Sequence, residues 1–204
     1  MPALTIRPAR PEDVDVAVHV LHDSMGGLAD YLYSGDSHHS VDRYLARMFQ
    51  IGGHRFSWDR SFIAKADGRS VGMLLSYPGG ELNKLQLAFI LHLPKLYRWS
   101  APRVLWRAAA LTTAPETAAD EYYVSNIGIL PEFQGRGYGA ELMSFAENQA
   151  CAARLPKCGL AVDESNRGAV RFYERLGYKI IFSKTFSGKM ARYESGYHRM
   201  VKTF

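Results

Sequence analysis

A glycine-rich stretch in the second half of the chain has the residue types and spacing of a phosphate-binding loop. It runs from Gln134 to Ala140, carries glycines at 135, 137 and 139, and follows an apolar segment that ends at Pro131. Glycine permits backbone angles that side chains forbid and lets the main chain approach a ligand closely. The loop opens a predicted helix, whose first amides lack intrahelical partners and carry partial positive charge. The sequence therefore predicts a pyrophosphate site at this loop.

Three kinds of phosphate loop compete for these residues. A P-loop ends in Gly-Lys-Ser/Thr, whereas Tyr138 and Ala140 follow the glycines here, so that motif is excluded. A dinucleotide fingerprint matches the letters, because Gly135-x-Gly137-x-x-Ala140 has the form G-x-G-x-x-A. Only about 65 residues follow the loop, however, which is too few for the βαβ series of a nucleotide domain. A nicotinamide-nucleotide enzyme is therefore a minor alternative.

The elements around the loop alternate between strands and helices. In the second half we expect a strand at Glu121–Leu130, a helix at Ala140–Arg154, a strand at Gly159–Val162, a helix at Asn166–Leu176 that stops at Gly177, and strands at Tyr178–Phe186 and Tyr197–Thr203. In the first half we expect a strand at Leu4–Arg7, a helix beginning at Glu12–Asp13, a weaker helical stretch after Gly26–Gly27, a helix at Val41–Ile51, and a hairpin of Ser61–Lys65 with Ser70–Tyr77. Residues 81–120 predict two or three helices inserted into the sheet topology. The pattern indicates an α/β fold with a mixed sheet.

Two sequence blocks together resemble the GCN5-related N-acetyltransferase (GNAT) superfamily. The first is Q/R-x-x-G-x-G/A, present as Gln134-Gly-Arg-Gly137-Tyr-Gly139 with Pro131 shortly before it. The second follows about 30 residues later as Asn166-x-x-Ala169-x-x-Phe172-Tyr173-x-x-x-Gly177-Tyr178. The opening IRPARPEDVDVA also looks like the first strand and helix of the family. The resemblance covers most of the chain except roughly residues 81–120.

The resemblance implies a fold and an activity. The fold is α/β (α+β), with a mixed, mostly antiparallel central sheet splayed between two strands and flanked by helices. The activity is that of an acyltransferase, an N-acetyltransferase that moves the acetyl group of acetyl-CoA to a primary amine by direct attack in a ternary complex. The co-substrate is acetyl-CoA and no metal is implied. A non-catalytic acyl-CoA-binding sensor is the alternative, since the family's base is missing at one of its usual positions.

The resemblance also assigns cofactor contacts. The strand backbone pairs with the pantetheine arm, and a main-chain amide near Ile129 polarises the thioester carbonyl. Asn166 bonds to the arm, although it also has the position of a helix N-cap, and both roles can hold together. The cofactor-binding positions are Ile127, Gly128, Ile129, Gln134, Gly135, Arg136, Gly137, Tyr138, Gly139, Ala140 and Asn166.

Tyr173 matches the family's general acid, which protonates the departing thiolate. The competing interpretation is a core aromatic, because Tyr173 shares helical spacing with apolar neighbours; we expect Phe172 to be the core member of that pair. The base is left unassigned. Family positions for a glutamate fall at Ala161 and near Tyr123, where no acid stands.

Two acids lie close to those positions. Glu121 and Asp163 are both expected to be solvated charges at strand ends, and water relayed to the sheet is open as the base. Arg167 and Arg171, like Arg136, could reach the cofactor's phosphates or lie on solvated helix faces.

Composition narrows the class of protein. The formal net charge is +5 and the pI about 9.2, yet no run of five or more basic residues occurs, so nucleic acid is not an expected partner. The N-terminus is too polar for a signal peptide, and the apolar stretch 85–93 is far short of the ~20 residues that a membrane span needs. We therefore expect a cytoplasmic protein with no membrane partner.

Metal and thiol chemistry are not expected. Asp15, His19, His22 and Asp23 could cluster on one helix face and His38–His39 are adjacent, but no familiar ligand spacing results. Cys151 and Cys158 form no CxxC pair and are expected to act as small apolar residues.

At 204 residues the chain is expected to form one domain, residues 1–204, with a helical insert at about 81–120. The insert could be a lid over the acceptor, a dimer surface or packing alone, and a homodimer stays open. The sequence does not name the amine, which the resemblance leaves among polyamines, aminoglycosides, amino acids, peptide N-termini and protein lysines.

Overall fold

The computed structural model describes residues 4–33, 41–109, 116–188, 190–193 and 195–204. The strands are β1 (Thr5–Pro8), β2 (Ser61–Ala66), β3 (Arg69–Pro78), β4 (Glu121–Ile129), β5 (Lys157–Asp163), β6 (Lys179–Thr185) and β7 (Gly196–Thr203). The α-helices are α1 (Val14–Met25), α2 (Gly27–Tyr33), α3 (Val41–Gln50), α4 (Leu82–Tyr97), α5 (Ala101–Ala109), α6 (Tyr138–Ala152) and α7 (Arg167–Arg175). Short 3-10 turns are η1 (Pro11–Asp13), η2 (Trp58–Arg60), η3 (Gly79–Glu81), η4 (Arg98–Ser100), η5 (Pro131–Phe133) and η6 (Met190–Arg192).

The strands form one mixed, mostly antiparallel sheet in the order β1-β2-β3-β4-β5-β7-β6. Among the described strands, β4 and β5 are the one parallel pair, and they lie side by side at the centre. Their pairing is short: it joins residues 121–124 to residues 157–160 and then stops. Beyond Val124 the sheet opens between β4 and β5, as expected of a splayed sheet.

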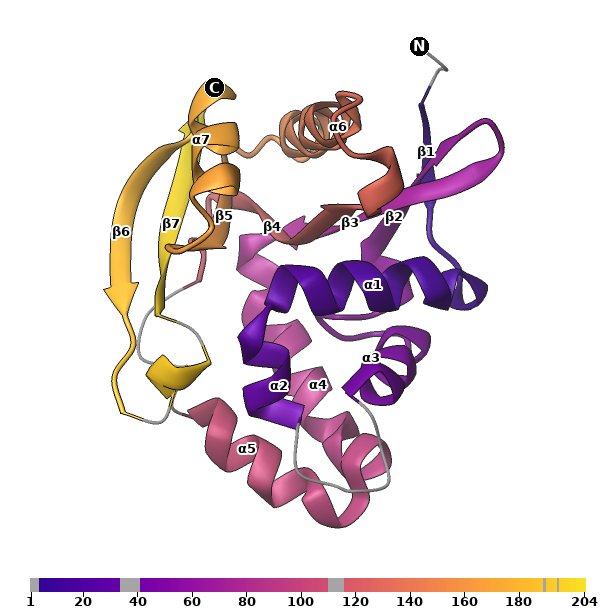
Figure 1. The fold of residues 1–204 in the computed structure, drawn as a ribbon, viewed down its shortest axis with the longest axis vertical. Helices are drawn as coiled ribbons and strands as arrows, with labels where there is room; N and C mark the ends of the chain where they lie inside the picture. The colour runs from indigo at the N-terminus through magenta and orange to yellow at the C-terminus, as the bar shows by residue number, and fades with distance from the viewer. Residues whose placement is uncertain (1–3, 34–40, 110–115, 189, 194) are drawn as a thin grey trace.

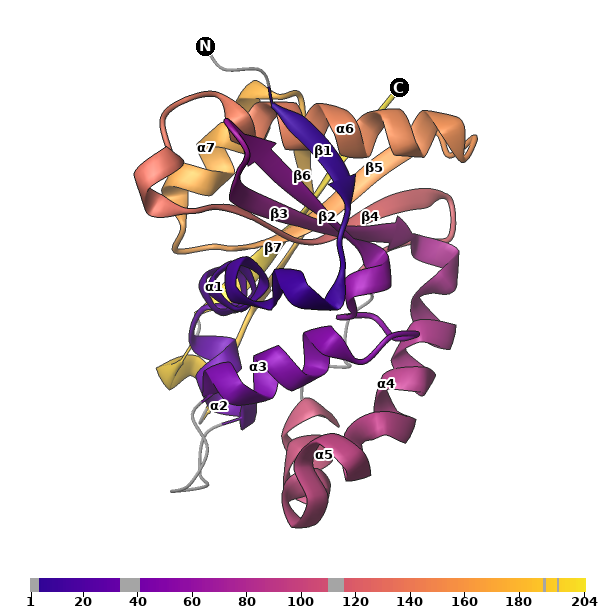
Figure 2. The same ribbon diagram turned by 90° about the vertical axis from the view of Figure 1, so that its right-hand side faces the viewer.

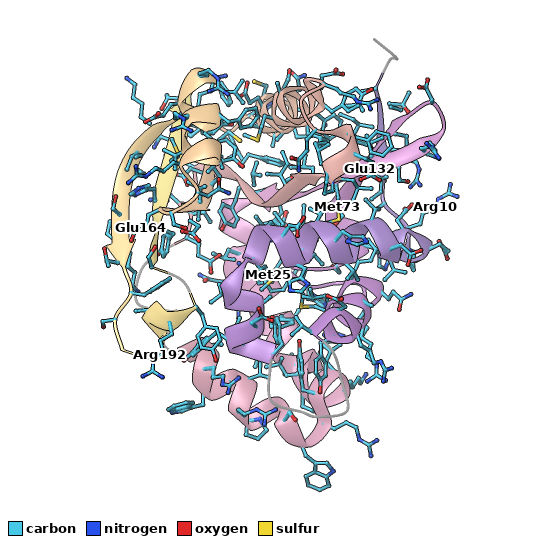
Figure 3. The ribbon with its side chains drawn as sticks, viewed as in Figure 1. Arg10, Met25, Met73, Glu132, Glu164 and Arg192 are labelled. Atoms are coloured by element: carbon cyan, nitrogen blue, oxygen red, sulfur yellow. The ribbon has the colours of Figure 1, made fainter. Side chains whose placement is uncertain are left out.

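Helices cover the sheet on both faces (Figures 1 and 2). The α6–α7 face carries α6 and α7, and the α1–α5 face carries α1, α2, α3, α4 and α5. Each face has its own hydrophobic core. Met25 and Met73, labelled in Figure 3, lie in the core of the α1–α5 face. Tyr173 lies in the core of the α6–α7 face.

Strand β4 changes its alternation at Ser125. Ser76 of β3 lies opposite Val124 and Leu75 lies opposite Asn126, so Ser125 is an extra residue, a β-bulge. Tyr122 and Val124 before it face the α6–α7 core. After it Ile127 and Ile129 face that same core, which the two-residue period alone would not allow. The bulge therefore lies where β4 leaves β5.

Local chemistry explains the sharpest turns. Asp67 and Gly68 join β2 to β3 with φ of 49° and 76°, the left-handed pair that a two-residue hairpin turn requires. Gly177 ends α7 with φ of 92°, and its amide donates to the carbonyl of Glu174. The expected hairpin and the expected stop at Gly177 are confirmed.

Helices are also present in the region 81–120, as α4 and α5. Helix α4 continues through Pro94 to Tyr97. A proline inside a helix lacks the amide hydrogen bond and crowds the carbonyl four residues earlier, and burial of Leu93, Leu96 and Tyr97 offsets this cost.

Candidate acetyl-transfer site

The opening between β4 and β5 leaves strand backbone without a partner strand. Residues 126–129 pair with β3 on one side, while β5 pairs with β7 alone from Ala161 onward. Within the described residues no strand adds to β4 on the open side. An extended ligand could therefore form main-chain hydrogen bonds there, as an added strand would. The positions 127–129, expected to contact the pantetheine arm, lie on this stretch.

The glycine loop follows directly and is built by backbone conformation. Gly135 and Gly137 have φ of 74° and 79°, and Gly137 is the N-cap of α6. A side chain at Gly135 would meet nothing within 4 Å, so the space beside it is open. The amides of Tyr138 and Gly139 precede the first intrahelical bonds, which Ala140 and Glu141 make to Gly137. Such amides suit an anion.

Side chains hold this loop in place. The amide of Gln134 donates to the carbonyl of Ile129 at 2.9 Å, which ties the loop back to the end of β4. The guanidinium of Arg136 donates to the carbonyl of Glu132 (Figure 3) at 3.1 Å. Both side chains are exposed. The side chain of Tyr138 is buried, so a ligand contact from this residue would come from its amide.

Asn166 caps α7. Its side-chain oxygen accepts a hydrogen bond from the amide of Ala169 at 3.0 Å, so the N-cap interpretation is confirmed. The cap uses the oxygen and leaves the side-chain NH₂ to donate elsewhere. The cofactor contact of Asn166 stays a prediction.

Tyr173 is a buried phenol in the core of the α6–α7 face, at 8% exposure. Burial raises its pKa to about 12, so the hydroxyl is protonated at every physiological pH. Its ring contacts the rings of Phe172 and Tyr178 at centroid distances of 5.2 and 6.1 Å. Phe172 is only partly buried, so the expectation that it would be the core member of the pair is wrong. The apolar side of α7 is instead centred on Tyr173, one residue later.

The expected strand-end acids are not alike. Asp163 accepts from the backbone amide of Ser165 at 2.7 Å near the surface. Glu121 is 2% exposed and accepts from Arg199 at 2.5 and 2.6 Å, and from Thr117 at 2.9 Å. The expectation that Glu121 is solvated is therefore wrong, because Arg199 on β7 compensates its charge.

A second buried cation lies under β4. Arg55 forms an ion pair with Glu116 and donates to Gln86 at 2.9 Å, and Tyr123 donates to Glu116 at 3.1 Å. Burial alone would raise the pKa of Glu116, but the charge of Arg55 and the hydrogen bonds from Arg55 and Tyr123 outweigh it and keep that pKa below its usual range. Sequence patterns missed this group, since Gln86 and Glu116 are 31 and 61 residues from Arg55. An anionic Glu116 held by Arg55 is a poor proton acceptor.

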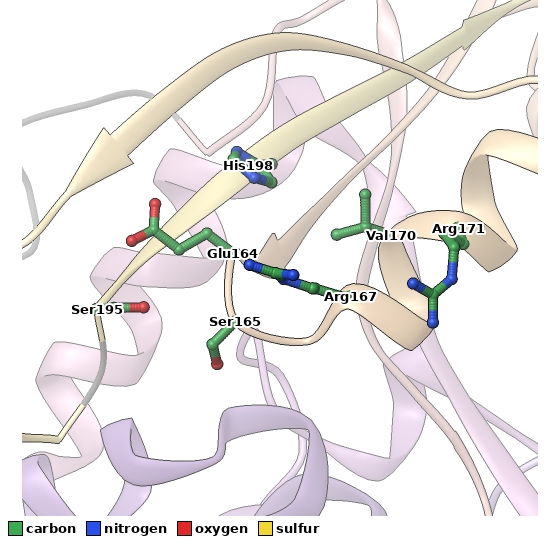
Figure 4. A pocket seen from close by; sticks show the side chains of 7 residues that line it. All are labelled: Glu164, Ser165, Arg167, Val170, Arg171, Ser195 and His198. Atoms are coloured by element: carbon green, nitrogen blue, oxygen red, sulfur yellow. The ribbon is translucent and has the colours of Figure 1, made fainter.

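Two cavities flank the α6–α7 face. One of about 310 Å³ lies beside the glycine loop and the β2–β3 turn, and Arg69 and Arg136 line it. The other, of about 670 Å³, lies between α7 and β7 (Figure 4). Its lining residues are Glu164, Ser165, Arg167, Val170, Arg171, Ser195 and His198. Both cavities present arginines, which suits phosphate groups.

The histidines and cysteines singled out in the sequence lie in different surroundings. The described residues hold no group of three or more His, Cys, Asp or Glu that could ligate a metal, and Nδ1 of His22 lies 2.7 Å from Oδ1 of Asp42. His38–His39 fall outside the described residues. Cys158 is buried, which raises the pKa of its thiol to about 11, while Cys151 is exposed and is not the apolar residue expected.

No helix of the described residues is both long and apolar enough to cross a membrane.

Comparisons with known proteins agree with this geometry. The family model described as "Acetyltransferase (GNAT) family" matches residues 28–178. A mycothiol acetyltransferase from Streptomyces griseus is 43% identical over 63 residues, which is 31% of this chain but only 20% of that protein. An acetyltransferase from Yersinia enterocolitica is 36% identical over 53 residues, 26% of this chain and 38% of that protein. The chain thus spans well under half of these relatives.

Solved structures share the fold. An N-acetyltransferase from Staphylococcus aureus superposes with a TM-score of 0.71 at 20% identity, covering 97% of this chain and 100% of that one. A GCN5-related N-acetyltransferase from Kribbella flavida gives a TM-score of 0.56 at 17% identity, covering 99% and 98%. At these identities the likeness concerns the fold alone.

Proposed function

Because the chain belongs to the acetyltransferase (GNAT) family, we propose that it transfers the acetyl group of acetyl-CoA to a primary amine within a ternary complex. The observation that carries the proposal is the opening between β4 and β5. It exposes the backbone of residues 125–129 directly before a glycine loop whose amides suit a pyrophosphate. We also propose that residues 1–204 form one domain, with α4 and α5 as its insert.

The residues of the open strand and the loop would hold the co-substrate. Backbone groups of Ile127, Gly128 and Ile129 pair with the pantetheine arm, and the amide of Ile129 stabilises the oxyanion. The amides from Gly135 to Ala140 take the pyrophosphate, with Gln134 bracing the loop and Arg136 available to the phosphates. Asn166 donates its free NH₂ to the arm.

The reaction is an acyl transfer. The lone pair of the neutral amine attacks the thioester carbonyl carbon, a C–N bond forms, and the C–S bond breaks to release the thiolate. Tyr173 gives its proton to the thiolate sulfur, the amine loses its proton to water, and a proton from water restores the phenol. Its raised pKa keeps the proton in place until the thiolate forms, and a thiolate generated in the same apolar surroundings is correspondingly more basic.

The test is a thiol-release assay with acetyl-CoA against a panel of amines that covers polyamines, aminoglycosides, amino acids, peptides and protein lysines. We expect amine-dependent release whose kcat falls about 10²- to 10⁴-fold in Tyr173→Phe. Tyr178→Phe is the matched control, because this neighbouring tyrosine is also buried and should keep turnover within a few fold.

Other outcomes discriminate between alternatives. Tight binding of acetyl-CoA without release by any amine would favour the non-catalytic sensor. Equal losses in the two tyrosine variants would remove Tyr173 from the role of acid and leave it as a core residue.

A further inference from the structure

The segment from Leu82 to Ala109, made of α4, η4 and α5, concentrates the charge of the chain; we call it the basic elbow. It contains five of the chain's 25 Lys and Arg residues and none of its 20 Asp and Glu residues. The rest of the chain therefore has 20 basic and 20 acidic residues and is formally neutral. The basic elbow alone accounts for the net charge of +5.

The same segment concentrates exposed apolar side chains. Trp99 is 94% exposed, Trp106 is 71% exposed and Leu91 is 69% exposed. Leu87, Ile90 and Leu105 are exposed as well. Six of the eleven large hydrophobic side chains that are exposed among the described residues thus lie in one segment of 28 residues. An apolar surface of this density marks an interaction site.

The exposed residues of α4 follow the helical period. Lys84, Leu87, Leu91 and Lys95 succeed one another at spacings of three or four, so they share the outer side of α4. The inner side buries Leu85, Phe89, Leu93 and Leu96 in the core of the α1–α5 face. Firm packing of the inner side presents the outer side as a fixed surface. A cation stands at each end of its apolar stripe.

The basic elbow lies far from the glycine loop. In Figures 1 and 2, α5 and the adjoining end of α4 form the end of the molecule opposite to α6. Arg107 is partly engaged within the fold, because it donates to the carbonyl of Tyr31 at 2.6 Å. Lys84, Lys95 and Arg98 are exposed cations of the segment. An occupant of this surface would not cover the opening between β4 and β5.

We propose that the basic elbow docks on an anionic lipid surface. Cations attract acidic headgroups, tryptophan rings lie favourably at the boundary between headgroups and acyl chains, and the leucines enter that boundary. A second copy of the chain would bring equal positive charge against it. A nucleic acid would neutralise the cations but leave Leu87 and Leu91 in water. Of these three occupants, the lipid surface alone satisfies both properties of the segment.

Such docking needs no membrane-spanning helix. The expectation of no membrane partner came from the lack of a long apolar span, and a protein that lies on the interface requires only an apolar, basic surface. The cations and the apolar side chains act together, so binding is reversible and depends on salt.

The experiment is co-sedimentation of the full chain with vesicles of phosphatidylcholine alone or with 30 mol% phosphatidylglycerol added. We expect binding to the anionic vesicles, weak binding to the neutral ones, and loss of binding at high salt. Brominated lipids should quench the tryptophan fluorescence, since two of the three tryptophans lie in the basic elbow.

Two sets of variants separate charge from apolar contact. Lys84→Gln/Lys95→Gln/Arg98→Gln should lower the partition constant roughly 100-fold. Trp99→Ala/Trp106→Ala should lower it about tenfold or more and abolish most of the quenching. The matched controls are Arg154→Gln/Arg175→Gln/Lys179→Gln and Ile181→Ala/Phe204→Ala, exposed residues outside the segment, which should bind within about threefold of wild type.

Each remaining outcome overturns the proposal. Wild-type protein that does not sediment with anionic vesicles contradicts it directly. Control variants that lose binding as much as the basic elbow variants would show a general charge effect. A wild-type dimer in sedimentation velocity that becomes a monomer in Trp99→Ala/Trp106→Ala would assign the surface to self-association. Binding of an RNA oligonucleotide with the same dependence on Lys84, Lys95 and Arg98, without vesicle binding, would assign it to nucleic acid.

Discussion

Two regions on opposite faces of the sheet are held by different kinds of interaction. On the α6–α7 face, the glycine loop and the start of α7 are held by bonds between near neighbours: Gln134 to Ile129, five residues apart, and Asn166 to Ala169, three apart. Under β4, on the α1–α5 face, ion pairs join residues 61 and 78 positions apart. Local backbone conformation builds the glycine loop and the start of α7, whereas charge pairs between distant residues stabilise the region under β4. Substitutions can test whether this difference holds.

The largest effect is expected from breaking a long-range pair. In Arg199→Met the carboxylate of Glu121, which is 2% exposed, loses its cation and becomes an uncompensated buried charge. We expect the free energy of unfolding, measured with urea, to fall by about 3–5 kcal/mol.

A nearby surface pair and a double variant serve as controls. Lys157→Met removes the partner of Asp120 at the exposed start of β5 and should not shift the urea midpoint measurably. Adding Glu121→Gln to Arg199→Met should restore most of the loss. If Arg199→Met is no worse than Lys157→Met, charge pairing does not order this face.

The next effect depends on pH. Burial, followed by the charge of His92, lowers the pKa of His54 to about 4. Between pH 6.5 and 4 the unfolded chain binds a proton that native His54 does not, so stability present above pH 6.5 is lost as the pH falls. We expect unfolding at pH 4.5 to cost about 2–3 kcal/mol less than at pH 7.

Variants locate that pH dependence. His54→Asn keeps an acceptor for the amide of Phe56, which His54 supplies through Nδ1 at 3.1 Å, and should lack the drop. His19→Asn, at an exposed histidine of α1, should retain it. A drop of equal size in both variants would place its origin elsewhere.

A smaller effect is expected at the glycine loop, the region built by local backbone conformation. Gly137→Ala and Gly53→Ala both place a methyl group on a residue with φ near 80–90°, so each should lower stability by about 1–2 kcal/mol. Only Gly137→Ala should raise the Kd for acetyl-CoA, by roughly tenfold, as measured by calorimetry. Equal Kd values in the two variants would contradict the assignment of the glycine loop.

The smallest effect separates two roles of Asn166. Asn166→Ala removes the cap of α7 and should cost about 1 kcal/mol, whereas Asn166→Ser keeps a capping oxygen and should preserve stability. Both variants lose the NH₂ donor, so both should weaken acetyl-CoA binding several fold. Wild-type affinity in Asn166→Ser would leave Asn166 as a cap alone.

The sequence predicted what depends on neighbours along the chain. The Asp67–Gly68 turn, the stop at Gly177 and the glycine loop at the start of α6 each rest on backbone angles that few residues can adopt. The resemblance of two blocks supplied the splayed sheet. Sequence periodicity could not tell Phe172 from Tyr173, because adjacent helical residues differ by only 100° and packing decides which one faces the core.

The partners of buried charges could not be predicted. Glu121 stands at the start of a strand, where a charged residue is usually exposed. No residue near it in the sequence indicates that Arg199 will pair with it. Arg55 likewise pairs with Glu116 across a stretch of chain that includes α4 and α5. Such pairs depend on topology, and a single sequence carries no local trace of them.

The bulge at Ser125 also limits how this chain can change in length. Deleting that one residue would leave every residue of the glycine loop intact, yet it would turn Ile127 and Ile129 toward α1 and point Gly128 toward α6. Gly128 now lies so close to α1 that a Cβ there would sit 3.0 Å from Val20, and an isoleucine could not take its place. Insertions and deletions can therefore accumulate in the connections of the sheet but not at Ser125. The number of residues in β4 there fixes which face of the sheet the residues before the glycine loop point to.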